Sequence, residues 1–362
     1  MSIFEKRRKK LIAAMQDVGI SAAVFSPSTD YRYLTGSSRQ ASQRETALFI
    51  SPGRTALLIP DFEKENEAVL AKELELVPYS DLDDAAELLS DFLPLKGCIA
   101  AGSEMRAKFL ISLQNQNSSL SWCCADTLMT PLRRRKDSDE IQLIETAQHM
   151  AERALSRLLT EPLVGKTERE IASRLMELRL QEGFDSVGSG IVASGPNTAL
   201  PHHINGDRRL SKNDILMFDI GGLYHGYRAD FTRTFAVGRV PDGFSEIYQI
   251  VLEAHFVGKK AARAGVPASE VDRAARQVIE KAGYGLYFTH RLGHGIGLDV
   301  HEAPFIVGTN SQLLETGNVF SCEPGIYLPG RFGVRIEDLL VLEENGALSL
   351  NTLSKELQIL PV

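Results

Sequence analysis

The sequence predicts an α/β protein of two domains, and three observations support this. With 362 residues, the chain is longer than a single hydrophobic core normally serves. Short apolar runs alternate with amphipathic helical patterns, which is typical of α/β folds. A polar stretch at 126–138 contains Pro131 and four consecutive basic residues, and we interpret it as a solvated linker. We therefore expect one domain over residues 1–130 and a second over residues 131–362.

The N-terminal domain is expected to begin with a basic amphipathic helix over residues 1–19. Its apolar run, residues 11–15, is interrupted by Gln16 and Asp17, so it is too short for a signal peptide. Short apolar runs predict strands at 21–25, 46–50, 55–59 and 98–102. Helical patterns occupy 62–75, 81–93 and 103–116. No glycine-rich phosphate loop is present in this half, so a nucleotide site is not predicted.

The C-terminal domain has clear helix start signals. Asp137 with Glu140, and Thr167 with Glu170, have the spacing of capping boxes, and the second helix is expected to stop at Gly183. Further helices are predicted at 245–264 and 268–282, and strands at 214–220, 228–236, 318–323 and 334–343. This order indicates hairpins instead of regular βαβ units.

Composition excludes several classes of function. The net charge of −7 argues against a general nucleic-acid binder, which is usually basic. No apolar run is long enough to span a bilayer, so no membrane partner is expected. The four cysteines, at 98, 123, 124 and 322, lack metal-finger spacing. We expect free thiols in a reducing cytoplasm.

Four carboxylates stand where strands should be apolar. Asp219 and Asp230 lie in two neighbouring apolar runs, and Glu323 and Glu337 repeat the arrangement further along. Burying an unpaired charge is costly, and a metal cation is one arrangement that makes close carboxylates favourable. An exposed hairpin with surface acids is the alternative, but the segment around Asp219 is too apolar to favour it.

Three of the eight histidines fall within residues 288–304, at positions 290, 294 and 301, and glycines surround the middle one. Four carboxylates with one imidazole, that of His294, suit divalent manganese, cobalt, iron or zinc. Five side chains are too many for one catalytic ion with an open position. They suit two ions bridged by shared carboxylates, about 3.5–4 Å apart.

The motifs FDIGG, ADFTRT, GHGIG, HEAP, EPGIY and VRIED follow one another in this order. This set resembles the metallopeptidase family with the pita-bread fold, which holds methionine aminopeptidases, Xaa-Pro aminopeptidases, Xaa-Pro dipeptidases and creatinase. The resemblance spans residues 197–338. A weaker match, STDYRYLTG at 28–36, is similar to the creatinase-type N-terminal domain. The resemblance implies a creatinase-like α/β domain followed by a pita-bread (α+β) catalytic domain.

The resemblance also implies roles for individual residues, and no expected metal ligand is replaced. Asp219 would bind one metal alone, Asp230 and Glu337 would bridge both, and His294 and Glu323 would complete the second. The two ions would be Mn²⁺, Co²⁺ or Zn²⁺. Glu323 would also accept the proton of the attacking water. The remaining expected site residues are His202 and His301 for the scissile carbonyl, His290 near the substrate, and Arg331 and Arg335 for a terminal carboxylate. Arg335 could equally support Glu337.

The function implied is metal-dependent hydrolysis of Xaa-Pro bonds in small peptides with proline at the second position. An Xaa-Pro dipeptidase is favoured, with an Xaa-Pro aminopeptidase acting on longer peptides as the alternative. A metal-free creatinase-like hydrolase and a non-catalytic binding module are more remote. Family resemblance further suggests a homodimer.

Overall fold

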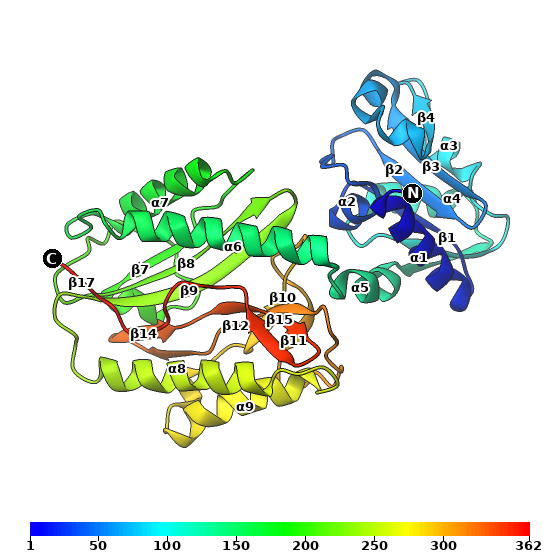
Figure 1. Cartoon of the computed structure of the whole chain (residues 1–362). Helices are drawn as coiled ribbons and strands as arrows, with labels where there is room; N and C mark the ends of the chain where they lie inside the picture. Colours follow the sequence, from blue (N-terminus) through cyan, green and yellow to red (C-terminus); the bar gives the residue numbers. More distant parts are fainter. The chain divides into compact units, whose positions relative to one another are not determined.

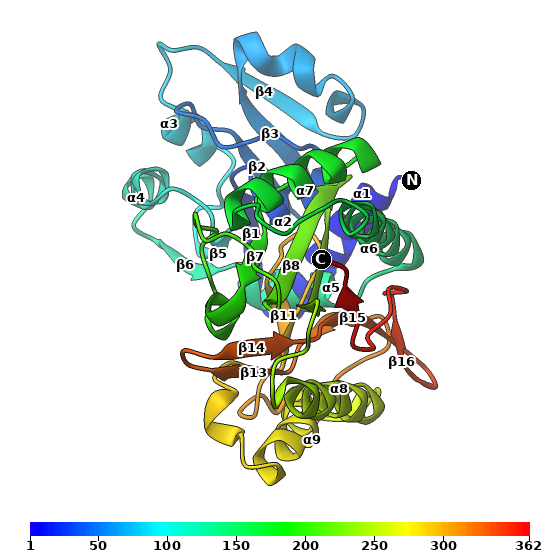
Figure 2. The same cartoon turned by 90° about the vertical axis from the view of Figure 1, so that its left-hand side faces the viewer.

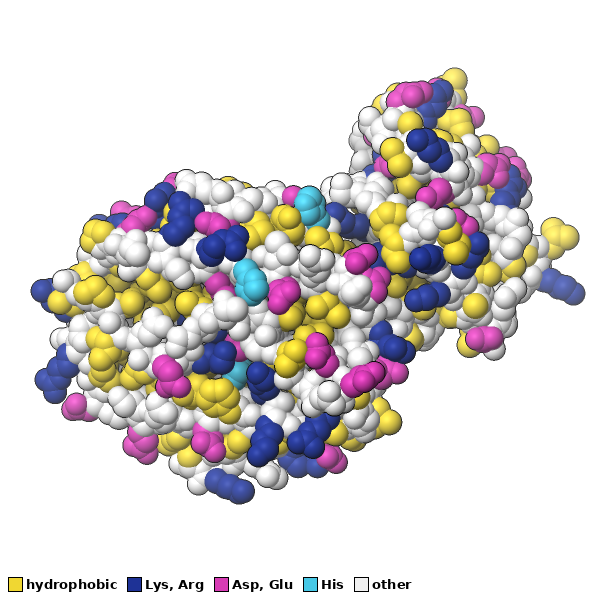
Figure 3. All heavy atoms as spheres, viewed as in Figure 1, with side chains coloured by type: hydrophobic (Ala, Val, Ile, Leu, Met, Phe, Trp, Pro, Cys, Tyr) yellow, Lys and Arg dark blue, Asp and Glu magenta, His cyan; other side chains and the backbone are white.

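The computed structural model describes residues 1–362 and divides into two compact units, Met1–Arg133 and Arg134–Val362 (Figure 1). None of the helices combines the length and the apolar character that a membrane span requires. On the face drawn in Figure 3, acidic and basic side chains are interspersed.

The first unit is built on a six-stranded mixed sheet in the order β4-β3-β2-β1-β5-β6. The pairs β1–β2 and β2–β3 are antiparallel, and the other pairs are parallel. Strands and helices follow the chain as α1 (Ile3–Asp17), β1 (Ile20–Phe25), α2 (Thr29–Thr35), β2 (Ala47–Ser51), β3 (Arg54–Pro60), η1 (Asp61–Glu67), η2 (Leu70–Lys72), β4 (Glu75–Tyr79), α3 (Ala85–Ser90), β5 (Gly97–Ala101), α4 (Ala107–Gln116), β6 (Leu120–Cys124) and α5 (Asp126–Arg134).

The core of this unit follows from the alternation of side chains along its strands. Val24 and Phe49 contribute to a buried cluster with Leu89 of α3 and Leu113 of α4. Helix α1 packs against α2 and β1. The four predicted strands and the helices at 81–93 and 103–116 are confirmed.

Two predictions in this half are wrong. Residues 62–75 form two short 3₁₀ helices instead of one α-helix, because the chain must turn back so that β4 can pair with β3. The stretch expected to be a solvated linker forms α5, with Pro131 inside it and with Leu128 and Met129 buried. Strands β4 and β6 were not predicted, because they form through pairing with neighbouring strands and lack a clear local apolar pattern.

The second unit contains a four-stranded sheet, β17-β9-β8-β7, a five-stranded sheet, β11-β10-β12-β15-β16, and the hairpin β13-β14. Its elements are α6 (Ser138–Leu158), α7 (Glu168–Glu182), β7 (Ile191–Ser194), η3 (Gly195–Ala199), β8 (Ile215–Tyr224), β9 (Tyr227–Val237), α8 (Phe244–Ala261), α9 (Ala268–Lys281), η4 (Gly285–Tyr287), β10 (Gly293–Gly295), β11 (Glu302–Ile306), β12 (Val319–Cys322), β13 (Gly325–Leu328), β14 (Phe332–Arg335), β15 (Asp338–Glu343), β16 (Gly346–Ser349) and β17 (Ile359–Leu360).

Helices enclose these sheets from two sides. Figures 1 and 2 show α6 and α7 on one side of the strands and α8 and α9 on the other. One buried cluster joins α6 and α7 to β8 and β9, and a second joins α8 and α9 to β12, β14 and β15. Capping boxes at Asp137/Glu140 and Thr167/Glu170 confirm the predicted helix starts. The strands are thereby held between two cores, and their inner faces carry the polar residues described next.

Candidate functional site

The hairpin β8–β9 brings two of the four carboxylates together. Asp219 is paired with Thr232, and Gly221 with Asp230. Residues directly opposite each other, and those two further along, share one face of an antiparallel pair. Asp219 and Asp230 therefore project from the same face, and their side chains are 26% and 14% exposed.

The second pair of carboxylates comes from the ladder between β12 and β15. Cys322 is paired with Asp338 at the end of this ladder. Glu323 directly follows the first strand, and Glu337 directly precedes the second. The predicted run at 334–343 is thus divided at residues 336–337, because the intervening chain forms the separate hairpin β13–β14. The two glutamates emerge side by side although thirteen residues separate them in the sequence.

His294 occupies the middle of the short strand β10, between β11 and β12. A β-carbon on Gly293 would overlap the carbonyl oxygen of Ser321, and one on Gly295 would overlap that of Ala303. Only glycine lets this strand lie so close to its neighbours. The glycines of the motif thus place the imidazole inside the site.

The imidazole of His294 faces two of the carboxylates. Its Nε2 lies 3.3 Å from Oε1 of Glu323 and 3.8 Å from Oδ2 of Asp230. Its Nδ1 lies 3.1 Å from the carbonyl oxygen of Gly295, which suits donation from Nδ1–H and leaves Nε2 as a free lone pair. Burial and the neighbouring His301 lower the pKa of His294 to about 3, so the ring is neutral, as a metal ligand must be.

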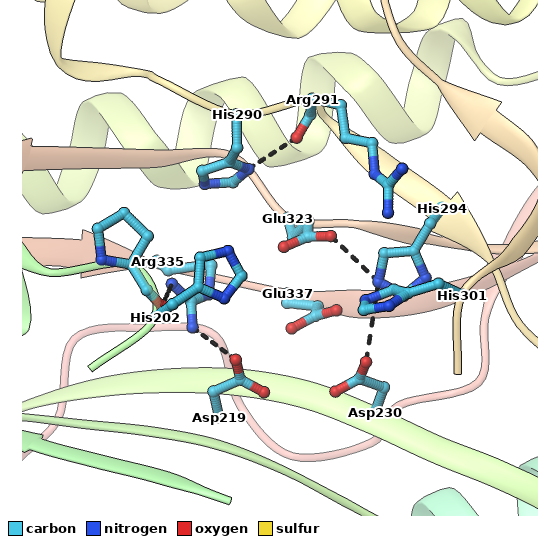
Figure 4. Close-up of a pocket in the computed structure, with 11 residues that line it drawn as sticks. His202, Asp219, Asp230, His290, Arg291, His294, His301, Glu323, Arg335 and Glu337 are labelled. Atoms are coloured by element: carbon cyan, nitrogen blue, oxygen red, sulfur yellow. Dashed lines mark hydrogen bonds and ion pairs between the residues drawn. The ribbon is translucent and has the colours of Figure 1, made fainter. Parts of the chain in front are cut away.

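These side chains line a cavity of about 340 Å³ (Figure 4). Ligand atoms of Asp230, His294 and Glu337 all lie within 4.8 Å of one another. The complete lining consists of Pro201, His202, Asp219, Asp230, His290, Arg291, His294, His301, Glu323, Arg335 and Glu337. The five expected metal ligands therefore meet in one cavity.

The carboxylates of this cavity repel one another and are only partly compensated by positive charge. Burial, reinforced by the negative charges of Asp219 and Glu323, raises the pKa of Asp230 well above its ordinary value. Burial and neighbouring carboxylates likewise raise the pKa of Glu337. Burial raises the pKa of Glu323 to about 7, although Arg335 opposes the shift. Crowded acids with a neutral imidazole fit divalent cations, because oxygen ligands and one nitrogen suit them and the cations remove the repulsion.

Arg335 forms an ion pair with one of the carboxylates of the cavity. Its side chain is 3% exposed, and Nη2 lies 2.7 Å from Oδ2 of Asp219. Its Nε donates to the hydroxyl of Thr232, which in turn donates to Oε2 of Glu337 over 2.7 Å. Arg335 thus supports two of the expected ligands, which is one of the two roles that the sequence left open.

A hydrogen-bonded chain links Arg335 to His290. Nη1 of Arg335 donates to the hydroxyl of Tyr327 over 2.8 Å, and that hydroxyl lies 2.8 Å from Nε2 of His290. Nδ1 of His290 faces the carbonyl oxygen of Arg291 at 2.7 Å. Burial and Arg335 lower the pKa of His290 to about 4. A neutral ring that accepts from Tyr327 through Nε2 agrees with all of these contacts.

The two other histidines border the same cavity. The ring of His301 stands edge-to-face against that of His294, with centroids 4.2 Å apart, and burial lowers its pKa. His202 lies on the segment after η3, next to Pro201, whose carbonyl oxygen accepts from Arg335. Both histidines line the cavity and have exposed surface.

Not every expected residue reaches the cavity. Arg331 is exposed at the tip of the β13–β14 hairpin, where it contacts the carbonyl oxygen of Asp242 and the ring of Phe332. The cavity is instead lined by Arg291, which sequence analysis did not select. Its place directly after His290 in the histidine-rich segment is the signal that could have drawn attention to it.

Comparisons with known proteins agree with this geometry. Residues 142–344 match Metallopeptidase family M24, and residues 7–134 match the Creatinase/Prolidase N-terminal domain. A "Probable dipeptidase PepE" from Mycobacterium tuberculosis is 37% identical, with 99% of this chain and 97% of that protein covered. An "Xaa-Pro dipeptidase" from Pyrococcus horikoshii is 34% identical, with 99% and 100% covered. A solved dipeptidase structure from Pyrococcus horikoshii OT3 superposes with a TM-score of 0.93 at 36% identity, covering 98% of this chain and 100% of that one.

Proposed function

The chain belongs to metallopeptidase family M24, and on this premise we propose that it is a dinuclear Xaa-Pro dipeptidase. The observation that carries the proposal is the meeting of four carboxylates and one neutral imidazole in a single cavity. Relatives named as dipeptidases and as an Xaa-Pro dipeptidase, matched over nearly the full chain, support the substrate class. The substrates would be small peptides with proline at the second position.

We assign the metal ligands as the resemblance implies. Asp219 would hold one ion, Asp230 and Glu337 would bridge the pair, and His294 and Glu323 would complete the second. Such an ion pair, of Mn²⁺, Co²⁺ or Zn²⁺, would lower the pKa of a water and polarise the scissile carbonyl. Arg335 would keep Asp219 oriented through its contact of 2.7 Å.

Side chains of the cavity would carry out the proton transfer and stabilise the carbonyl oxygen. Glu323 would accept the proton of the attacking water and pass it to the leaving proline nitrogen. Ser321 keeps this carboxylate in place, because its hydroxyl donates to Oε1 over 3.0 Å. His202 and His301 would hydrogen-bond the carbonyl oxygen as negative charge develops on it. His290 would contact the substrate, and its ring is held in place by the hydrogen bond to Tyr327.

Metal analysis together with kinetics tests this function. Purified enzyme should hold about two divalent ions per chain and hydrolyse alanyl-proline, and chelation should abolish activity until metal is restored. A metal-free, active protein would indicate the creatinase-like alternative. A protein that binds metal but cuts neither alanyl-proline nor a longer Xaa-Pro peptide would contradict the proposal. Faster cleavage of the longer peptide would identify an Xaa-Pro aminopeptidase.

We also propose that the enzyme works as a homodimer in the cytoplasm. The four cysteines are free, as expected for a reducing compartment. Sedimentation of the active enzyme should give the mass of two chains. A fully active species with the mass of one chain would contradict the dimer.

A further inference from the structure

Two arginines line the cavity, and they differ in how their charges are used. Arg335 is buried, and its nitrogens donate to Asp219, to the hydroxyls of Thr232 and Tyr327, and to the carbonyl oxygen of Pro201. The guanidinium of Arg291 has neither a hydrogen bond nor an ion pair, and it lies over the ring of Phe305, 4.5 Å from the centroid. Arg291 is therefore the cavity cation with unused donors.

Phe305 is the aromatic neighbour of this guanidinium. The aromatic residue belongs to β11 and is 38% exposed. A cation–π contact gives the guanidinium N–H groups no oxygen acceptor, so they remain available for a planar, bidentate acceptor such as a carboxylate. Figure 4 shows the side chain of Arg291 directed toward His294 and Glu323. The free donors thus face the expected metal ligands.

The dimensions of a dipeptide determine which cation can reach its terminus. The carboxylate of an Xaa-Pro dipeptide lies within about one residue length, roughly 3.5 Å, of the scissile bond. A cation that binds it must therefore line the cavity that contains the metal ligands. Arg331, on the exposed hairpin tip, is not part of that wall.

Charge balance points to the same residue. Two divalent cations would neutralise the four carboxylates of the site. The two arginines would then leave the cavity with net positive charge, and Arg335 already contacts Asp219, whereas Arg291 has no anionic partner. A substrate anion is the group that would pair with Arg291.

We propose that Arg291, held over Phe305, binds the terminal carboxylate of the substrate and makes the enzyme select dipeptides. This inference rests on the proposed Xaa-Pro dipeptidase function. In an Xaa-Pro-Yaa tripeptide the carboxylate lies one residue further away, and in a dipeptide amide the charge is absent. Both substrates lose the charge-assisted hydrogen bonds to Arg291.

The test compares alanyl-proline with alanyl-proline amide, using the metal-loaded enzyme and three variants. For the wild type, kcat/KM should favour the free acid roughly 10- to 100-fold. Arg291→Gln should bring this ratio close to one, mainly through a higher KM for the acid. Arg291→Lys should retain part of the preference, because lysine keeps the charge but loses the bidentate geometry. Arg331→Gln is the matched control and should keep the wild-type ratio.

Metal content and thermal unfolding are measured for each variant, so that a change in the ratio is read only from folded, loaded enzyme. The inference is overturned if Arg291→Gln keeps the full preference, if Arg331→Gln loses it, or if the wild type cuts acid and amide equally. Each of these results leaves the Xaa-Pro activity itself intact. A loaded wild type that cuts neither substrate refutes the proposed function, and the inference fails with it.

Discussion

Replacing Asp230 by asparagine should have opposite effects on the metal-free and the metal-loaded protein. The change keeps the shape of the side chain and removes one charge. The backbone at this position is held independently, because the side-chain amide of Gln148 donates to the carbonyl oxygen of Asp230 over 2.7 Å and accepts from its N–H over 3.0 Å. The effect therefore reports on charge and not on a displaced strand.

Without metal, the Asp230→Asn variant should be more stable than the wild type. Burial and the charges of Asp219 and Glu323 raise the pKa of Asp230, so its ionised form is unfavourable in the folded state. Neutralising a buried, poorly compensated charge stabilises by about 1–4 kcal/mol. We expect the lower half of that range, because a raised pKa already lets part of the population take up a proton. A gain of about 1–2 kcal/mol corresponds to a rise in Tm of roughly 2–8 °C for a domain of this size.

With metal, the same substitution should be harmful. A neutral amide is a poor ligand for a hard cation, so metal occupancy should fall and activity should drop by at least about 100-fold. Calorimetry with and without added Mn²⁺, metal analysis and hydrolysis of alanyl-proline measure the three effects. The wild type should gain more in Tm from metal than the variant gains. A metal-free variant less stable than the wild type, or a variant with normal activity, would refute the reasoning.

Asp338 offers a matched control of opposite sign. It is buried, but its carboxylate lies 2.8 Å from the guanidinium of Arg233 and 2.7 Å from the ammonium of Lys355. Burial opposes its ionisation, yet these cations outweigh burial and lower the pKa of Asp338 to about 2. Asp338→Asn leaves Arg233 uncompensated and should destabilise the protein by about 3 kcal/mol with or without metal.

Two further substitutions test other parts of the catalytic unit. The buried carboxylate of Glu168 accepts from residues 194, 197, 203 and 206 on the segment that carries His202. Glu168→Gln should therefore lower kcat/KM about 10-fold with metal content unchanged, and unaltered kinetics would contradict this role. Burial lowers the pKa of His255 to about 4, so the native ring stays neutral while the unfolded chain takes up a proton below about pH 6.5. Stability should fall by about 2–3 kcal/mol as pH drops from 6.5 to 4, and His255→Gln should remove this slope in urea unfolding. An equal slope in both proteins would show that other groups cause it.

Local signals in the sequence predicted the elements whose determinants are local. Capping boxes at residues 137 and 167 fixed two helix starts, because the bonds that form them join residues three positions apart. Carboxylates inside apolar runs indicated a polar site between strands, and the structure brings all five expected ligands to one cavity.

Features that depend on distant contacts could not be predicted in the same way. Residues 62–75 are rich in helix formers, yet pairing between β3 and β4 leaves room only for 3₁₀ turns. The basic stretch near Pro131 contains Leu128 and Met129, which α5 buries. The availability of Arg291 depends on where Phe305, fourteen residues away, places its ring. None of these partners can be identified from local sequence alone.

The β13–β14 hairpin connects the two strands that position Glu323 and Glu337, but it is not part of the ladder that brings these residues together. Because Cys322 and Asp338 pair directly, Glu323 and Glu337 lie side by side whatever the length of the hairpin tip between them. The exposed tip at residues 329–331 is therefore free to acquire insertions or new side chains during evolution. Exchanging this tip between relatives should therefore leave the metal ligands, and with them catalysis, unchanged.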